Sequence, residues 1–162
     1  MRAKQKLGLF NNRYNPAIDP SRIILVATDG SGDAGTIGEA LAIANSLSPA
    51  PSTTAPVTIQ VATGDVTENN PLTIPTGISI EALDSPGSWT SRAADPTQPI
   101  FLLNSNTALR GLQIYGANGG GGVGIQTVSG ATRIQLYDLI ITINQTNLQL
   151  GIWRVFLQKV NQ

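Results

Sequence analysis

The amino-acid sequence predicts a mainly β protein, a short parallel β-helix of about three coils that follows one α-helix. Three observations lead to this prediction. A single helical pattern occurs near the N-terminus, at residues 36–48. From residue 57 onward, short β-rich runs alternate with turns, and no helical pattern separates them. Finally, segment 109–115 matches segment 136–142 at an offset of 27 residues, which is typical of one coil in a stacked repeat fold.

The length and charge of the chain restrict its class. A chain of 162 residues suits one domain of ordinary size. Ten basic and ten acidic residues give a formal net charge of zero, so there is no overall electrostatic reason to bind nucleic acid or an anionic membrane. No apolar run approaches the roughly 20 residues of a membrane helix. Surfaces with little net charge tend to associate, which favours other protein subunits as partners.

The residue types that are missing restrict the chemistry. The chain contains no cysteine and no histidine, which excludes disulfides, thiolate zinc sites and histidine-assisted nucleophiles. From residue 99 onward the only acidic residue is Asp138. One carboxylate forms neither a calcium cage nor an acid–base pair. We therefore predict a non-enzymatic protein with no catalytic residue, metal site or cofactor.

Residues 1–22 have no clear periodicity and contain five of the ten basic residues. They are either a frayed terminus or an extended basic arm that lies on a neighbouring subunit. The basic residues are not densely clustered, so contact with nucleic acid is only weakly indicated. In the arm interpretation, the apolar anchors are Leu7, Leu9, Phe10 and Tyr14.

The first regular elements are a strand at residues 23–27 and a helix that begins after Thr36. The strand is apolar and rich in β-branched residues. Thr36 and Glu39 have the spacing of a capping box, and the helix should end at residues 46–48, before Pro49. A loop rich in Pro, Ser and Thr follows at 48–56. The apolar positions of the helix share one face: Ile37, Ala40, Leu41, Ala44 and Leu47.

The glycine-rich stretch D-G-S-G-D at residues 29–33 admits three interpretations. It resembles a calcium loop, but it lacks the bidentate Glu at the twelfth position. A G-x-G-x-x-G pattern begins at Gly30, but no phosphate-binding Lys and no crossover helices follow. The third interpretation is a tight turn from strand to helix, in which glycines allow positive φ and Asp29 or Asp33 bonds to the backbone. We favour the turn.

The β-rich runs group into three sets of three strands. In this grouping Ile80 occupies the place of Ile114, provided that residues 84–98 are an inserted loop. Trp89 and Arg92 then lie in a polar loop, where they would stack on a sugar or meet a partner subunit; alternatively, Trp89 folds back over the edge of the coil. The three sets are 57–61, 72–74 and 78–82; 99–103, 108–110 and 112–116; and 123–128, 133–136 and 139–143.

The order of these elements resembles the opening of pectin-lyase-like right-handed β-helix proteins, such as pectinesterases and the modules of phage tailspikes. The resemblance rests on D29-G-S-G-D33, the Thr-Ile…Glu-Ala-Leu helix, V57-T-I-Q-V61 and P71-L-T-I-P-T-G-I-S-I80, and covers roughly residues 23–145. It implies a right-handed coil whose N-terminal end is capped by the helix. The chain has no counterpart of the D-F-I-F-G stretch that carries a catalytic aspartate in pectinesterases. The resemblance therefore implies the fold without the activity.

The C-terminal residues 148–162 are strongly apolar and alternate in part. An open end of a β-helix would expose strand edges, so this segment either caps that end or extends as an arm to a neighbouring subunit. As an arm it would use Trp153 and Phe156. The predicted organisation is an arm at 1–22, a capped β-helix domain at 23–147 and a C-terminal cap or arm at 148–162.

Two functions are compatible with this organisation. The first is a structural component of a virion, a capsid-associated, cement or tail protein that assembles with protein subunits through its arms and faces. Its viral setting follows from the resemblance to tailspike modules, as does a further possibility, the N-terminal piece of a longer tailspike. The alternative is a carbohydrate-binding or polysaccharide-processing module. Its glycan contacts would be Trp89, Arg92, Arg110, Tyr115 and Tyr137.

Overall fold

The computed structural model describes residues 19–116, 124–143 and 151–157. Its elements begin with the 3-10 turn η1 (Pro20–Arg22), strand β1 (Ile23–Val26) and helix α1 (Ile37–Ser46). The helix is too short to cross a membrane. The strands that follow are β2 (Val57–Val61), β3 (Gly64–Glu68), β4 (Leu72–Ile74), β5 (Ile78–Ala82), β6 (Trp89–Ala93), β7 (Phe101–Leu103), β8 (Thr107–Arg110), β9 (Leu112–Tyr115), β10 (Ile125–Thr127), β11 (Ile134–Ile143) and β12 (Gly151–Leu157).

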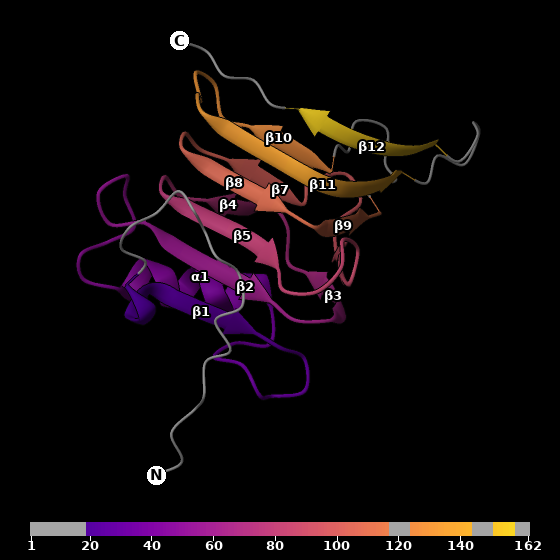
Figure 1. The fold of residues 1–162 in the computed structure, drawn as a ribbon. Helices are drawn as coiled ribbons and strands as arrows, with labels where there is room; N and C mark the ends of the chain where they lie inside the picture. Colours follow the sequence, from indigo (N-terminus) through magenta and orange to yellow (C-terminus); the bar gives the residue numbers. More distant parts are fainter. Residues whose placement is uncertain (1–18, 117–123, 144–150, 158–162) are drawn as a thin grey trace.

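The strands form two sheets, a curled and largely parallel sheet of nine strands and a separate parallel sheet of three, and from β2 to β10 every third strand returns to the same row (Figure 1). The first row is β1, β2, β5, β8 and the first part of β11. The second is β3, β6, β9 and the second part of β11. The third is β4, β7 and β10. In Figure 1 the stack runs from β1 and α1 at the bottom to β11 and β12 at the top.

The predicted offset of 27 residues is confirmed by the pairing of β11 with β8 and β9. Leu136 is in register with Leu109, and Ile141 is in register with Ile114. The extension of this repeat to earlier strands was wrong. Ile80 pairs with Leu109 and not with the Ile114 row, because a strand intervenes where a loop was expected.

That strand is β6, which lies within residues 84–98 and pairs with β3 on one side and β9 on the other. Its sequence, W-T-S-R-A, lacks the apolar alternation of a half-buried strand, because the small polar Ser91 takes an inward position and is fully buried. Strand β3 was not predicted for a similar reason, because its inward positions include the charged residue Glu68 and so lack an apolar pattern. The three-strand circuits are therefore β2–β3–β4, β5–β6–β7 and β8–β9–β10, a grouping that differs from the predicted one.

The core consists of inward side chains stacked in register from one circuit to the next. Ile59 pairs with Ile80, which pairs with Leu109, and all three are fully buried. Each such residue packs on equivalents above and below it, which removes apolar surface from water along the whole stack. The apolar face of α1 packs at the end of this column, against β1 and β2.

The start of α1 follows the prediction closely. Thr36 is the N-cap, and its Oγ1 accepts a hydrogen bond from the Glu39 backbone N–H at 3.0 Å. The Glu39 carboxylate reaches back to the N–H of Gly35 at 2.8 Å, one residue before the cap that a capping box would use. The helix ends at Ser46, within the predicted range.

One corner of each circuit has a residue with positive φ. Gly77, Asn106 and Arg133 have φ values of 83°, 57° and 57°. They follow one another up the stack, since the Gly77 N–H donates to Asn106 O at 3.0 Å and Asn106 N–H donates to Thr132 O at 3.0 Å. Asparagine tolerates this conformation better than most residues that carry a side chain. At Gly77 only glycine fits, because a Cβ atom would lie 2.2 Å from the carbonyl oxygen of Ser52.

The two ends of the chain are described in part. Arg22, at the end of the predicted arm, donates to the carbonyl oxygens of Pro56, Pro49 and Ala55 and so holds the proline-rich loop. Strand β12, within the predicted C-terminal segment, pairs antiparallel with β11. Leu9, Phe10 and Tyr14 lie outside the described residues. The proposed assembly roles of these residues and of Trp153 and Phe156 in β12 stay predictions.

Candidate functional site

Outward side chains on two adjacent rows form two similar columns, each with an acid, an arginine and a tyrosine. On the second row, Arg92 of β6 is in register with Tyr115 of β9, and Asp65 lies on the neighbouring β3. On the first row, the register aligns Glu81 of β5, Arg110 of β8 and Tyr137 of β11. We name these the Arg92 column (Asp65, Arg92 and Tyr115) and the Arg110 column (Glu81, Arg110 and Tyr137).

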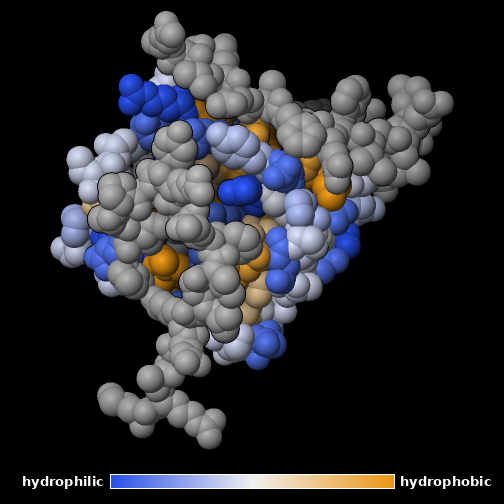
Figure 2. All heavy atoms as spheres, in the orientation of Figure 1, coloured by the Kyte–Doolittle hydropathy of each residue, from blue (hydrophilic) through white to orange (hydrophobic). Residues whose placement is uncertain are grey.

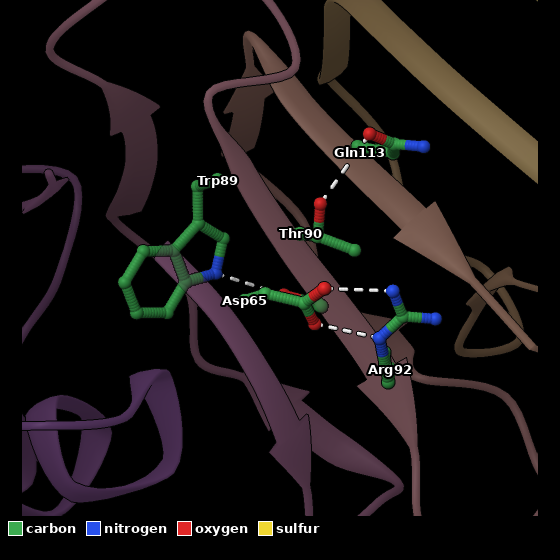
Figure 3. A network of polar contacts seen from close by, with 6 residues as sticks. Asp65, Trp89, Thr90, Arg92 and Gln113 are labelled. Atoms are coloured by element: carbon green, nitrogen blue, oxygen red, sulfur yellow. Dashed lines mark hydrogen bonds and ion pairs between the residues drawn. The ribbon is translucent and has the colours of Figure 1, made fainter. Parts of the chain in front are cut away.

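The Arg92 column is tightly organised. Arg92 Nε lies 2.6 Å from Asp65 Oδ1, and Nη2 lies 2.7 Å from Oδ2, so the pair is bidentate (Figure 3). The guanidinium Cζ lies 4.5 Å from the ring centroid of Tyr115, a cation–π contact. The hydrogen bond from Arg92 lowers the pKa of Asp65. Both side chains remain accessible, with 40% of Arg92 and 52% of Asp65 exposed. The column therefore presents a fixed charge pair and a ring at the surface.

A polar pair extends this surface. Thr90 lies two residues before Arg92 in β6, on the same outward side of the strand. Its hydroxyl donates a hydrogen bond to Gln113 Oε1 at 3.3 Å. Thr90 is in register with both Asp65 and Gln113. In Figure 3 these side chains lie on one side of the sheet, and Trp89 points to the other side.

Trp89 is therefore not a surface contact, and the expectation that it meets a sugar or partner from a loop was wrong. Its side chain is 0% exposed, and its Nε1–H donates to Ser91 Oγ at 3.1 Å inside the core. Trp89 faces the interior because residues on a strand alternate between faces, and Arg92 falls on the outward set. Treating residues 84–98 as a loop concealed this alternation.

The Arg110 column borders a small open hollow of about 180 Å³, which is lined by Arg110, Tyr137 and Asp138 among the described residues. At the base of the column, Gln60 Nε2 donates to Glu81 Oε1 at 3.1 Å. Asp138 has a φ of 50° and lies where the pairing of β11 shifts register, at the turn between two rows. The structure thus places Arg92 with Tyr115, and places Arg110 with Tyr137 on the adjacent row.

The stretch at residues 29–33 is the tight turn that we favoured. Asp29 Oδ1 accepts from the Ser31 N–H at 2.9 Å, and Asp33 Oδ2 accepts from the Leu25 N–H at 2.9 Å. The bonds from Ser31 lower the pKa of Asp29. Gly30 has a φ of 79°, and a Cβ on Gly32 would lie 2.6 Å from Leu25 O. The Asp29 carboxylate therefore bonds within the turn, and the Asp33 carboxylate bonds the end of the turn to the backbone of β1.

Glu68 is a buried carboxylate whose contact with α1 the sequence did not predict. It is only 1% exposed, and its carboxylate accepts from the N–H groups of Ile37 at 2.9 Å and Gly38 at 3.2 Å, at the start of α1. Burial raises the pKa of Glu68, and the two backbone bonds oppose that rise. The residue joins β3 to the helix and satisfies donors that a helix start leaves unpaired.

The other carboxylates show the same pattern of internal use. Within the described residues, every acidic side chain except that of Asp138 accepts a hydrogen bond from the protein itself. In the same ranges, no group of three His, Cys, Asp or Glu residues is placed to hold a metal ion. The acceptors are Asp19, Asp29, Asp33, Glu39, Asp65, Glu68, Glu81, Asp84 and Asp95.

The fold and the surface together define the class of the protein as mainly β, with a curled parallel sheet and two outward acid–arginine–tyrosine columns. No family model matches the chain, and no curated protein or solved structure matches it either.

Proposed function

We propose that the chain is a short right-handed parallel β-helix of the pectin-lyase-like kind, capped at its N-terminal end by α1. The three-strand circuits and their in-register pairing support this proposal. The right hand is supported by the strong preference of connections between parallel strands for that hand. The position of α1 against β1 and β2 supports its role as a cap.

We further propose that this β-helix is a non-enzymatic structural protein that assembles with other protein subunits. The observation that carries the proposal is the internal use of the carboxylates: groups that would supply acid–base chemistry instead bond to the backbone, to Arg92 or to neighbouring side chains. Such a stack is a rigid body that presents several flat faces. The resemblance to tailspike modules favours a virion as the place of assembly.

Native mass measurement tests the assembly. We expect the full-length chain at micromolar concentration to form oligomers of defined size, because its net charge of zero provides no repulsion between copies. A chain that lacks residues 1–18 serves as the comparison, since it keeps Arg22 and the loop that Arg22 holds. The proposal is contradicted if both chains are monomers and the parent chain is also absent from purified virus particles.

The alternative function is glycan binding, and the two columns specifically favour it. A guanidinium held by a carboxylate offers directed donors to sugar hydroxyls, and the ring of Tyr115 offers a face for the sugar. The Arg110 column adds a hollow with the same residue types. If a polysaccharide binds, we expect it to lie along these rows.

The glycan alternative predicts that Tyr115→Ala weakens binding to a polysaccharide identified on a glycan array by about tenfold, the equivalent of about 1.4 kcal/mol. The loss follows from removing the ring beside Arg92. Thr73→Ala, an exposed position on β4 in the third row, is the matched control and should bind as the parent chain does. Isothermal titration measures both. Equal affinity for all three chains would reject this surface as the glycan site.

A further inference from the structure

Asp138 occupies a corner position that holds a glycine one circuit earlier. Arg110 is in register with Tyr137, so the residues that follow them, Gly111 and Asp138, lie at equivalent corners. Both have positive φ, 71° for Gly111 and 50° for Asp138. Glycine adopts this conformation without steric conflict, whereas a residue with a side chain adopts it under strain. The fold alone therefore does not require a carboxylate at this corner.

The Asp138 carboxylate also has no structural partner. The other carboxylates of the described ranges accept hydrogen bonds from the protein, several of them from backbone N–H groups. Asp138 is only partly exposed, yet among the described residues it has neither a hydrogen bond nor an ion pair. Aspartate usually reaches positive φ with the help of a local side-chain bond, and Asp138 makes none. A strained residue that the backbone does not use is a candidate for function.

Two further side chains without partners line the same hollow as Asp138. They are Arg110 and Tyr137, and within the described part of the chain neither makes a hydrogen bond or an ion pair. Arg110 and Asp138 border one hollow of about 180 Å³ without pairing with each other. The space between the two charged groups is therefore open to a ligand.

The Arg92 column shows similar residue types in the opposite state. Arg92 occupies both carboxylate oxygens of Asp65, and its guanidinium lies against the ring of Tyr115 (Figure 3). That column keeps a ring and spare N–H donors, but its carboxylate is already bonded. The hollow beside Arg110 and Asp138 instead keeps a donor, an acceptor and a ring at the same time.

These groups together select a ligand that both accepts and donates hydrogen bonds. A guanidinium only donates, and an ionised carboxylate only accepts. Two adjacent hydroxyl groups of a sugar can accept from Arg110 and donate to Asp138, while the apolar face of the sugar ring lies on Tyr137. An anionic ligand would meet Asp138 and the neighbouring Glu81, and a cationic ligand would meet Arg110.

The volume of the hollow limits the size of this ligand. Pockets that hold drug-sized ligands measure roughly 300–1,000 Å³, whereas this hollow measures about 180 Å³. It therefore suits a ligand of about one sugar ring, or one unit of a longer chain.

We propose that the hollow lined by Arg110, Tyr137 and Asp138 binds one neutral sugar unit, with two adjacent hydroxyl groups held between the guanidinium and the carboxylate. The inference rests on the glycan alternative given under Proposed function. Within that alternative it names the subsite, adds Asp138 to it and specifies the class of sugar.

Asp138→Gly tests the role of the carboxylate, because it introduces the residue type found at the same corner one circuit earlier. We expect urea unfolding to stay close to that of the parent chain, since glycine accepts the positive φ. Binding of a neutral sugar should weaken by about tenfold or more, because the hydroxyl groups lose a charged acceptor. Asp138→Asn, which also tolerates positive φ, is the second variant and should bind less tightly than the parent chain.

Arg133→Gly is the matched control. It also removes an exposed charge from a position with positive φ, 57°, and Arg133 is not among the residues that line the hollow. This variant should bind the sugar as the parent chain does.

Amide chemical-shift changes in the full-length chain measure the binding. The probes are the methyl glycosides of glucose, galactose and mannose at millimolar concentration, with glucuronate and glucosamine as charged counterparts. At least one neutral glycoside should produce saturable shifts at Arg110, Tyr137 and Asp138, and it should bind more tightly than both charged sugars.

The outcomes separate the subsite from the glycan alternative. The subsite is wrong if Asp138→Gly binds as the parent chain does, if glucuronate binds more tightly than the neutral glycosides, or if no probe produces saturable shifts at the three residues. In each case the glycan alternative stands if the parent chain still binds a polysaccharide on the array and Tyr115→Ala weakens that binding. If neither the array nor the glycosides show binding, the subsite and the glycan alternative fail together.

Discussion

Replacing Trp89 with alanine should lower the free energy of unfolding by about 3–5 kcal/mol, the range for removing a large aromatic side chain from a core. Trp89 is the largest of the fully buried side chains among the residues whose burial the structure describes. Its ring packs over Gly64, where a Cβ atom would lie 2.8 Å from Trp89 Cζ3, so the backbone of β3 has come close to the indole. Small neighbours such as Gly64 cannot fill the space that the indole would leave.

Urea unfolding followed by far-ultraviolet circular dichroism measures this loss, since one of only two tryptophans is removed and fluorescence is compromised. Arg92→Ala in the same strand is the matched control. It loses an exposed ion pair with Asp65 and a stacked contact with Tyr115, and should cost only about 1 kcal/mol. If the two variants lost the same stability, the placement of Trp89 in the core would be contradicted.

Replacing Glu68 with alanine should destabilise the protein by about 2–4 kcal/mol, because the N–H groups of Ile37 and Gly38 lose their acceptor at a buried helix start. Negative charge also interacts favourably with the N-terminal end of a helix. The loss should loosen α1 from β3. A smaller effect is expected for Glu39→Ala, the control, because Glu39 is exposed and bonds a single N–H, that of Gly35.

The pH dependence of stability provides a second measurement on Glu68. Burial raises its pKa above the ordinary value of 4.5, so the folded chain holds the proton more firmly than the unfolded chain. This contribution to stability is fully present below pH 4.5 and is lost as pH rises through the folded pKa. Relative to Glu68→Gln, which does not titrate, the parent chain should lose stability over that window. A constant difference between the two chains across it would show that Glu68 does not titrate with a raised pKa.

Local patterns in the sequence determined several elements correctly. Thr36 and Glu39 predicted the helix start, because capping depends on residues within one turn. The alternating apolar run at 57–61 predicted β2, and the match of Ile114 with Ile141 predicted the register of β9 and β11. These features depend on near neighbours or on direct repetition, so the sequence by itself is sufficient to show them.

Only the tertiary structure decided which residues meet across the circuits. Glu68 reaches a helix that begins 31 residues earlier, and Asp65 binds Arg92 across 27 residues. The polar sequence of β6 does not by itself predict a strand. It forms one because β3 and β9 supply backbone hydrogen-bonding partners on its two sides. Inward and outward faces are set by register between strands that are distant in the chain. For this reason Trp89 is a core residue here, although its sequence context is that of a surface loop.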